Sequence, residues 1–127
     1  MVSRVSYLVA LGALLAAPSL AFGDDDHLPK RVGECVMTRI SELGSRLQGV
    51  SDSGNSVSYE NGGYGVSYST VKELQRSRVG DRVKLCLVSI PEDCPPGDDR
   101  GKEYKATNLR TKGTWTLPDA SHMCGGA

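Results

Sequence analysis

The sequence predicts a mostly β fold, a small OB-like barrel of five or six strands with one short helix, cross-linked by disulfides. Three observations predict it. Residues 34–117 contain short segments in which apolar and polar side chains alternate with the period of a strand. A single short helical pattern falls between the third and fourth of these segments, the order found in OB-like barrels. Four cysteines, an even number, permit two bridges. An SH3-like barrel and an open β-roll fit the same order.

The first predicted strand covers residues 35–41, where Val36, Thr38 and Ile40 alternate with polar or sulfur-containing side chains. Gly44 permits a bend or bulge in its continuation. Residues 51–54 are rich in serine, aspartate and glycine, which predicts a turn.

A β-hairpin is predicted over residues 57–68, because Asn61-Gly62-Gly63 separates two alternating runs. Asparagine and glycine accept the positive φ that a tight hairpin turn needs. Tyr59, Tyr64 and Tyr68 occupy alternating positions, so we expect them on one face. That face is either core or a stacking surface for bases or sugars, and core is favoured because the intervening residues are Ser, Gly and Glu.

The second half of the chain predicts a helix followed by more strands. Thr70 and Glu73 have the spacing of a capping box for a helix ending near residue 77. Residues 82–90 form the most apolar strand, which predicts a central position, and Pro91 ends it. A loop follows over residues 91–101. Strand patterns return at residues 104–108 and 114–117, with a turn at 111–113 and a tail after Pro118.

The N-terminal region reads as a secretory signal peptide, with Arg4 before an apolar run over residues 5–17. Cleavage fits the small-residue rule after Ala21 or after Gly23, and we prefer Gly23. The run is shorter than the roughly 20 apolar residues of a membrane-spanning helix, so no membrane anchor is expected in the mature chain. The predicted organisation is therefore a signal peptide (1–23), a flexible leader (24–33) and a single β-rich domain (34–127).

Export to the periplasm or beyond predicts that the cysteines form two disulfides. Four cysteines allow three pairings. We predict Cys35 with Cys86, which joins two strands, and Cys94 with Cys124, which pins the tail to a proline-rich loop. A zinc site is disfavoured, because the cysteines lack close-pair ligand spacing.

Charge and composition argue against several function classes. Fourteen basic and fifteen acidic residues follow residue 23, so there is no electrostatic case for nucleic acid as a partner. His27 and His122 are the only candidates for a neutral-pH base, and no nucleophile motif accompanies either. We therefore expect no enzyme activity, no catalytic residue, no cofactor and no bound metal.

The candidate interaction surface combines the hairpin tyrosines with the acidic loop. In the loop, Arg100 is expected to neutralise its neighbours and to favour salt-bridged turn chemistry over a calcium or acid/base site. The residues singled out are Tyr59, Tyr64, Tyr68, Asp98, Asp99 and Arg100.

Several segments together resemble an uncharacterised family of small bacterial secreted proteins. They are residues 57–68, 80–87, 94–101, 108–111 and 122–127. The resemblance implies export and a compact domain, and it transfers no site residues. Ser53-Gly54 and Tyr59 are also similar to a segment of periplasmic lysozyme inhibitors, which are small disulfide-bonded β-barrels. The tryptophan expected soon after that segment is absent from this sequence.

The expected function is that of an exported, non-enzymatic binding module in the bacterial envelope, with an unknown protein or envelope component as its partner. One alternative is a protein inhibitor of a hydrolase such as lysozyme, acting through the loop at residues 91–101. A further alternative is a minor metal-binding or hydrolytic activity centred on His122 and the loop acids.

Overall fold

The computed structural model describes residues 10, 12–13 and 23–126 of the chain. The mostly β prediction is confirmed, with three strands, one short helix and three further strands. In chain order the elements are β1 (Cys35–Leu47), β2 (Val50–Tyr59), β3 (Tyr64–Ser67), α1 (Lys72–Gln75), β4 (Arg82–Ser89), β5 (Glu103–Asn108) and β6 (Thr114–Pro118). The predicted signal peptide lies almost wholly outside the described residues. In the part that is described, no helix is long and apolar enough to span a membrane.

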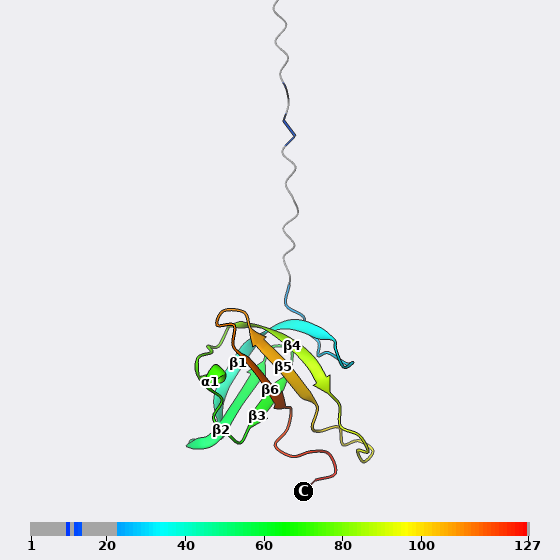
Figure 1. Cartoon of the computed structure of the whole chain (residues 1–127). Coiled ribbons are helices and arrows are strands. Elements are labelled where there is room, and N and C mark those ends of the chain that lie inside the picture. The colour runs from blue at the N-terminus through cyan, green and yellow to red at the C-terminus, as the bar shows by residue number, and fades with distance from the viewer. Residues whose placement is uncertain (1–9, 11, 14–22, 127) are drawn as a thin grey trace, which may run out of the picture.

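The six strands form one antiparallel sheet in the order β3-β2-β1-β4-β5-β6 (Figure 1). β4 lies between β1 and β5, which confirms its predicted central position. The edge strands β3 and β6 come close together, since a Cβ atom on Gly65 would lie 3.3 Å from the Cβ atom of Leu117. Between the described residues these two strands share no ladder, so the sheet curls round its core without closing into a barrel.

Strand β1 belongs to both halves of the sheet, because its first half pairs with β4 and its second half with β2. Its register shifts between Ile40 and Glu42 and again between Ser45 and Leu47, on either side of Gly44. The predicted bend near Gly44 is thus confirmed. A bend at this point lets one continuous strand serve both halves of a curled sheet.

The turn predicted at residues 51–54 is wrong, because those residues belong to β2. The chain reverses instead at Gly49, which has a φ of 77°. The Ser53 hydroxyl accepts a hydrogen bond from the Leu47 backbone N–H and donates one to the Val50 carbonyl, so it stabilises the turn from within the strand. Gly54 has a φ of 100°, and a Cβ atom there would lie 1.8 Å from the Ser67 carbonyl oxygen. The serine, aspartate and glycine residues at 51–54 therefore form an irregular part of β2 and not a turn.

The predicted hairpin is confirmed, with residues 55–58 of β2 paired to β3. The Asn61 side-chain oxygen accepts a hydrogen bond from the Gly63 N–H within the turn. Helix α1 is shorter than predicted, and its capping box does not form: Val71 is the N-cap and no side chain caps the helix. The Asn55 side-chain oxygen accepts the Val71 N–H instead, at 2.6 Å. A partner from another element has replaced the expected local cap.

The core lies inside the curl of the sheet and is closed at one side by Leu74 of α1. It contains the single tryptophan, Trp115, whose Nε1–H donates to the Tyr59 hydroxyl at 2.9 Å. The buried apolar side chains are Val36, Ile40, Val57, Tyr59, Val66, Leu74, Val83, Leu85, Leu87, Tyr104, Ala106, Trp115 and Leu117. No buried side-chain polar atom of the described residues lacks a hydrogen bond.

A polar network centred on Asp81 ties the segment after α1 to the start of β4 and to the β5–β6 turn. The Asp81 carboxylate is nearly buried, and it accepts hydrogen bonds from Arg110 Nε at 2.8 Å and from Asn108 Nδ2 at 2.9 Å. It also accepts the Arg78 backbone N–H. The Arg110 guanidinium holds the pKa of Asp81 well below its ordinary value of 3.8.

This network predicts an acid-sensitive contribution to stability. Because the folded-state pKa of Asp81 is depressed, its contribution is complete above the ordinary value of 3.8 and is lost as the pH falls below it toward the folded-state pKa. Urea unfolding at a series of pH values should therefore show a steeper acid decline for the wild type than for Asp81→Asn, which is expected to be less stable at neutral pH. Parallel acid limbs would contradict this assignment.

Residues 24–33, predicted as a flexible leader, lie against the domain in this structure. Pro29 is buried and Leu28 packs against the core. The Asn61 side-chain N–H donates to the His27 carbonyl at 3.1 Å. The packed part of the chain therefore includes residues that precede the predicted boundary at residue 34.

Candidate interaction surface

The three hairpin tyrosines do not share a face, so that prediction is wrong. Tyr59 is 5% exposed and belongs to the core, where burial raises the pKa of its hydroxyl. Tyr64 and Tyr68 are 37% and 57% exposed. The alternation breaks because β3 is only four residues long and Val66, between the two exposed tyrosines, is buried. Tyr59 is therefore not part of an interaction surface.

Both predicted disulfides are present, Cys35 with Cys86 and Cys94 with Cys124. The second bridge joins the loop at residues 91–102 to the tail at residues 119–126, and we call these two segments together the clamped lobe. Figure 1 shows them below the sheet, in yellow-green and in orange to red, at the end opposite to the entry of the N-terminal segment.

Polar contacts complete the clamped lobe. The Cys124 N–H donates to the Arg100 carbonyl at 2.9 Å, and the Gly125 N–H donates to the Asp98 carboxylate at 2.9 Å. Arg100 forms a two-point ion pair with Asp98, and this pair depresses the pKa of the Asp98 carboxyl. The predicted salt-bridged turn is confirmed for these two residues. Asp99 is exposed, with Lys102 Nζ at 3.9 Å.

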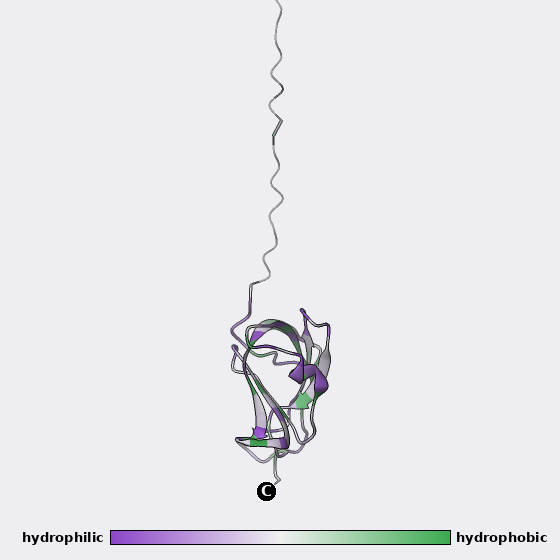
Figure 2. Cartoon of the chain, turned by 90° about the vertical axis from the view of Figure 1, so that its left-hand side faces the viewer, coloured by the Kyte–Doolittle hydropathy of each residue, from purple (hydrophilic) through white to green (hydrophobic). Residues whose placement is uncertain are grey.

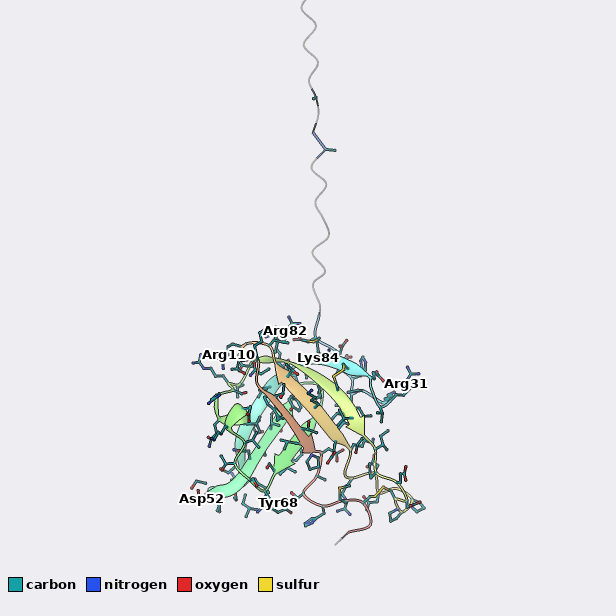
Figure 3. All side chains as sticks on the ribbon, in the orientation of Figure 1. Arg31, Asp52, Tyr68, Arg82, Lys84 and Arg110 are labelled. Atoms are coloured by element: carbon teal, nitrogen blue, oxygen red, sulfur yellow. A yellow bond between two sulfur atoms is a disulfide. The ribbon has the colours of Figure 1, made fainter. Side chains whose placement is uncertain are left out.

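The tail also connects Tyr68 to the clamped lobe. The Tyr68 hydroxyl donates to the Ser121 carbonyl at 2.9 Å, and the guanidinium of Arg46 lies 4.1 Å from the centre of the Tyr68 ring. Arg46 is in the β1–β2 ribbon, whose tip exposes Leu47 and Val50. Figure 3 shows Tyr68 and Asp52 together at this lower end of the molecule.

We define the rim as the β1–β2 tip, Tyr68 and the clamped lobe. It unites two parts of the surface predicted from sequence, Tyr68 and the Asp98–Arg100 turn, and leaves out Tyr59 and Tyr64. The exposed apolar side chains on the rim are Leu47, Val50, Tyr68 and Met123. Met123 packs on the backbone of Gly101, where a Cβ atom would come within 2.8 Å of its sulfur.

Sequence reasoning missed Arg46, Leu47, Val50 and Met123. The first three lie next to the observed turn at Gln48-Gly49, whereas the turn was predicted at residues 51–54. Met123 lies in a tail without periodicity. The signal that could have found Leu47 and Val50 is their position on either side of Gln48-Gly49, a short turn flanked by apolar residues.

A groove of about 320 Å³ opens between the β1–β2 ribbon and α1. It is lined by Leu43, Gly44, Ser45, Asn55, Ser56, Leu74, Gln75 and Ser77. None of these side chains is ionisable. Asn55 and Ser77 already bond the backbone of residues 71 and 73, so they are committed to holding α1 in place. The groove carries no arrangement for acid, base or metal chemistry.

Two histidines and the loop carboxylates were the residues considered for catalysis or metal binding. Within the described ranges, no group of three His, Cys, Asp or Glu side chains is placed to hold a metal ion. His122 is exposed in the tail, and His27 is exposed near the other end of the chain, next to Asp26.

Ser53 and Tyr59, for which a likeness to lysozyme inhibitors was considered, are both buried. Ser53 is 7% exposed, and its hydroxyl is bonded within the β1–β2 ribbon. Tyr59 is bonded to Trp115 in the core. Neither side chain is presented to a partner.

Comparisons with known proteins add no relative: no protein-family model matches the chain, and no curated protein or solved structure matches it.

Proposed function

We propose that this protein is an exported, non-enzymatic binding module and that the rim is its partner-facing surface. The observation that carries the proposal is the clamped lobe. Among the described residues of the lobe, only Gly101 is buried. The Cys94–Cys124 bridge therefore fixes the shape of a surface segment and does not support a hydrophobic core. Fixing a surface segment before binding reduces the entropy lost on association.

The chemistry of the rim favours a protein partner with a basic surface. Residues 91–102 contain four carboxylates against two basic side chains. Complementary charge speeds association and selects partners. Tyr68 and Met123, both more than half exposed, supply apolar anchors beside that charge. Large apolar and aromatic side chains of this kind usually carry most of the binding energy.

Two disulfides favour an oxidising, extracellular compartment for this module. Cleavage after Gly23 and residence in the bacterial envelope are part of the proposal. We also propose that the fold is a variant of the OB-like barrel. The place of α1 between β3 and β4 supports that relationship, and the lack of pairing between β3 and β6 is the departure from it.

Paired substitutions on and away from the rim test the function. Immobilised, oxidised protein is incubated with envelope extract, and the captured partner is then titrated against three variants. Tyr68→Ser and Met123→Ser should each weaken binding by roughly tenfold or more, the usual effect of losing an anchor. Val79→Ser is the matched control, because Val79 is 63% exposed and lies outside the rim. Equal loss in all three variants, or no specific capture by the wild type, would reject the rim.

Inhibition of a hydrolase is the second candidate, favoured by the protruding, disulfide-held loop at residues 91–102. Such a loop can enter an active-site cleft without losing much freedom. A panel of lysozymes and proteases assayed with the oxidised wild type and with Asp99→Lys would test it. The expected result is inhibition by the wild type that weakens in the variant. No inhibition at micromolar concentration would remove this candidate.

A further inference from the structure

Arg39 of β1 and Arg82 of β4 stand directly opposite each other in the β1–β4 register. Like charges in that arrangement destabilise a sheet unless an anion lies between them. The anion here is Asp24, whose two carboxylate oxygens lie 2.6 Å from Arg39 Nε and 3.2 Å from Arg82 Nε. Arg39 also donates to the Gly80 carbonyl, which orients its guanidinium. The two arginines form a receptor for one carboxylate.

Beside this receptor lies a stretch of β1 that has a neighbouring strand on one side only. Residues 35–38 of β1 pair with β4 on one side, and β2 joins the other side only from Ile40. At Met37 the free side is used by Asp25: the Asp25 N–H donates to the Met37 carbonyl at 2.6 Å, and the Met37 N–H donates to the Asp25 carboxylate at 2.9 Å. A strand edge that no other strand of the sheet pairs can accept an extended peptide through backbone hydrogen bonds.

The segment seated there is itself short and acidic. Figure 2 shows it as the hydrophilic stretch that joins the domain, in keeping with three consecutive aspartates at residues 24–26. Its anchor is at Leu28 and Pro29, which pack against the domain, whereas the Asp26 side chain is fully exposed. Asp24 and Asp25 can therefore leave the edge while residues 28–29 stay in place.

We propose that the β1 edge at Met37, together with Arg39 and Arg82, is a binding site for an extended peptide segment with two adjacent acidic residues, and that Asp24 and Asp25 occupy it as an internal competitor. Lys84 lies opposite Met37 in the same register and adds positive charge. Figure 3 shows Arg82 and Lys84 at the upper end of the molecule, away from Tyr68 on the rim. The site is thus distinct from the rim and does not depend on the proposed function.

Vacating the site in the full chain tests the proposal. The probe is a fluorescein-labelled peptide with the sequence of residues 22–27, Phe-Gly-Asp-Asp-Asp-His, and the control peptide has Asn at the three Asp positions. Fluorescence anisotropy should show that the Asp24→Ser/Asp25→Ser protein binds the acidic probe at least tenfold more tightly than the wild type does. The Asn peptide should not bind. Adding Arg39→Gln to the vacated protein should abolish binding of the probe.

Three results would overturn the proposal: equal binding of the probe by the vacated and wild-type proteins, equal binding of both peptides by the vacated protein, or no binding of the probe at about 1 mM vacated protein. Fluorescence of the single tryptophan checks that each variant is folded. If the double variant does not fold, the milder variant Asp24→Asn replaces it. Analytical sedimentation of the wild type tests whether the edge is instead occupied by the N-terminal segment of a second copy of the chain. A dimer that Asp24→Asn dissociates would mean that the edge receives the same segment of a second copy, which would also overturn the assignment to a separate acidic peptide.

Discussion

Replacing Cys35 and Cys86 together with alanine is expected to lower the free energy of unfolding by about 4 kcal/mol, because their bridge spans 51 residues of the chain and restricts the unfolded state accordingly. The two cysteines are directly opposite in the β1–β4 ladder, so the native hydrogen bonds do not depend on the bridge. Urea unfolding of the oxidised wild type and the double variant, followed by tryptophan fluorescence, measures the difference.

The matched control is the Cys94→Ala/Cys124→Ala variant, whose bridge spans 30 residues. This bridge holds the clamped lobe outside the core, so its loss should appear first as faster hydrogen exchange in residues 91–102 and 119–126. The strands should stay protected, because their backbone bonds and core contacts are intact. A loss of less than about 1 kcal/mol for the Cys35/Cys86 variant would contradict the expectation that restriction of the unfolded chain dominates.

Asn108→Ala is expected to lower the free energy of unfolding by about 3 kcal/mol, because buried groups would lose their hydrogen-bond partner. Asn108 is 0% exposed, and its Nδ2 donates to the Ser77 hydroxyl and to the Asp81 carboxylate. Its Oδ1 accepts the backbone N–H groups of Arg110 and Thr111, which shapes the β5–β6 turn. One small side chain thus satisfies four polar groups. Urea unfolding at neutral pH measures the loss.

The control for this prediction is Ser77→Ala, which removes one of the partners of Asn108 and should cost about 1 kcal/mol. The two substitutions together should cost less than the sum of their separate effects, since they break the same hydrogen bond. If Asn108→Ala costs no more than Ser77→Ala, the turn and the Asp81 network do not depend on Asn108 in the way described.

The candidate interaction surface was predictable only in part. The clamped lobe was predictable, because one cysteine lies in a proline-rich loop and its partner lies in the C-terminal tail. The ion pair of Asp98 with Arg100 was also predictable, because it requires only a turn between neighbouring residues. The joining of Tyr68 to the lobe was not predictable, because it depends on a hydrogen bond between residues 53 positions apart. The burial of Tyr59 depends on Trp115, 56 positions away, for the same reason.

The sequence by itself determined the elements whose causes are local. Period-two alternation, the turn at Asn61-Gly62, the stop at Pro91 and the central place of the apolar strand at residues 82–90 each depend on neighbouring side chains and on backbone preferences. The disulfide pairing was predicted correctly, but the sequence left three pairings open and the structure decided between them. These features would read the same in many folds of this class.

Tertiary structure alone decided which side chains serve as partners. Asn55 accepts the backbone N–H at the start of α1, where Thr70 was expected to cap the helix. Ser53 bonds across the turn at Gly49, although it was itself predicted to lie in a turn. Asp24 and Asp25, predicted to belong to a flexible leader, bond to β1. Asn55 and Asp25 lie 16 and 12 positions from the backbone groups that they bond, whereas Ser53 bonds across its own turn, to residues three and six positions away. A curled, incompletely closed sheet has backbone N–H and C=O groups at its bend and edges that no neighbouring strand pairs. Their hydrogen-bond partners are therefore whichever polar groups the fold brings close in space.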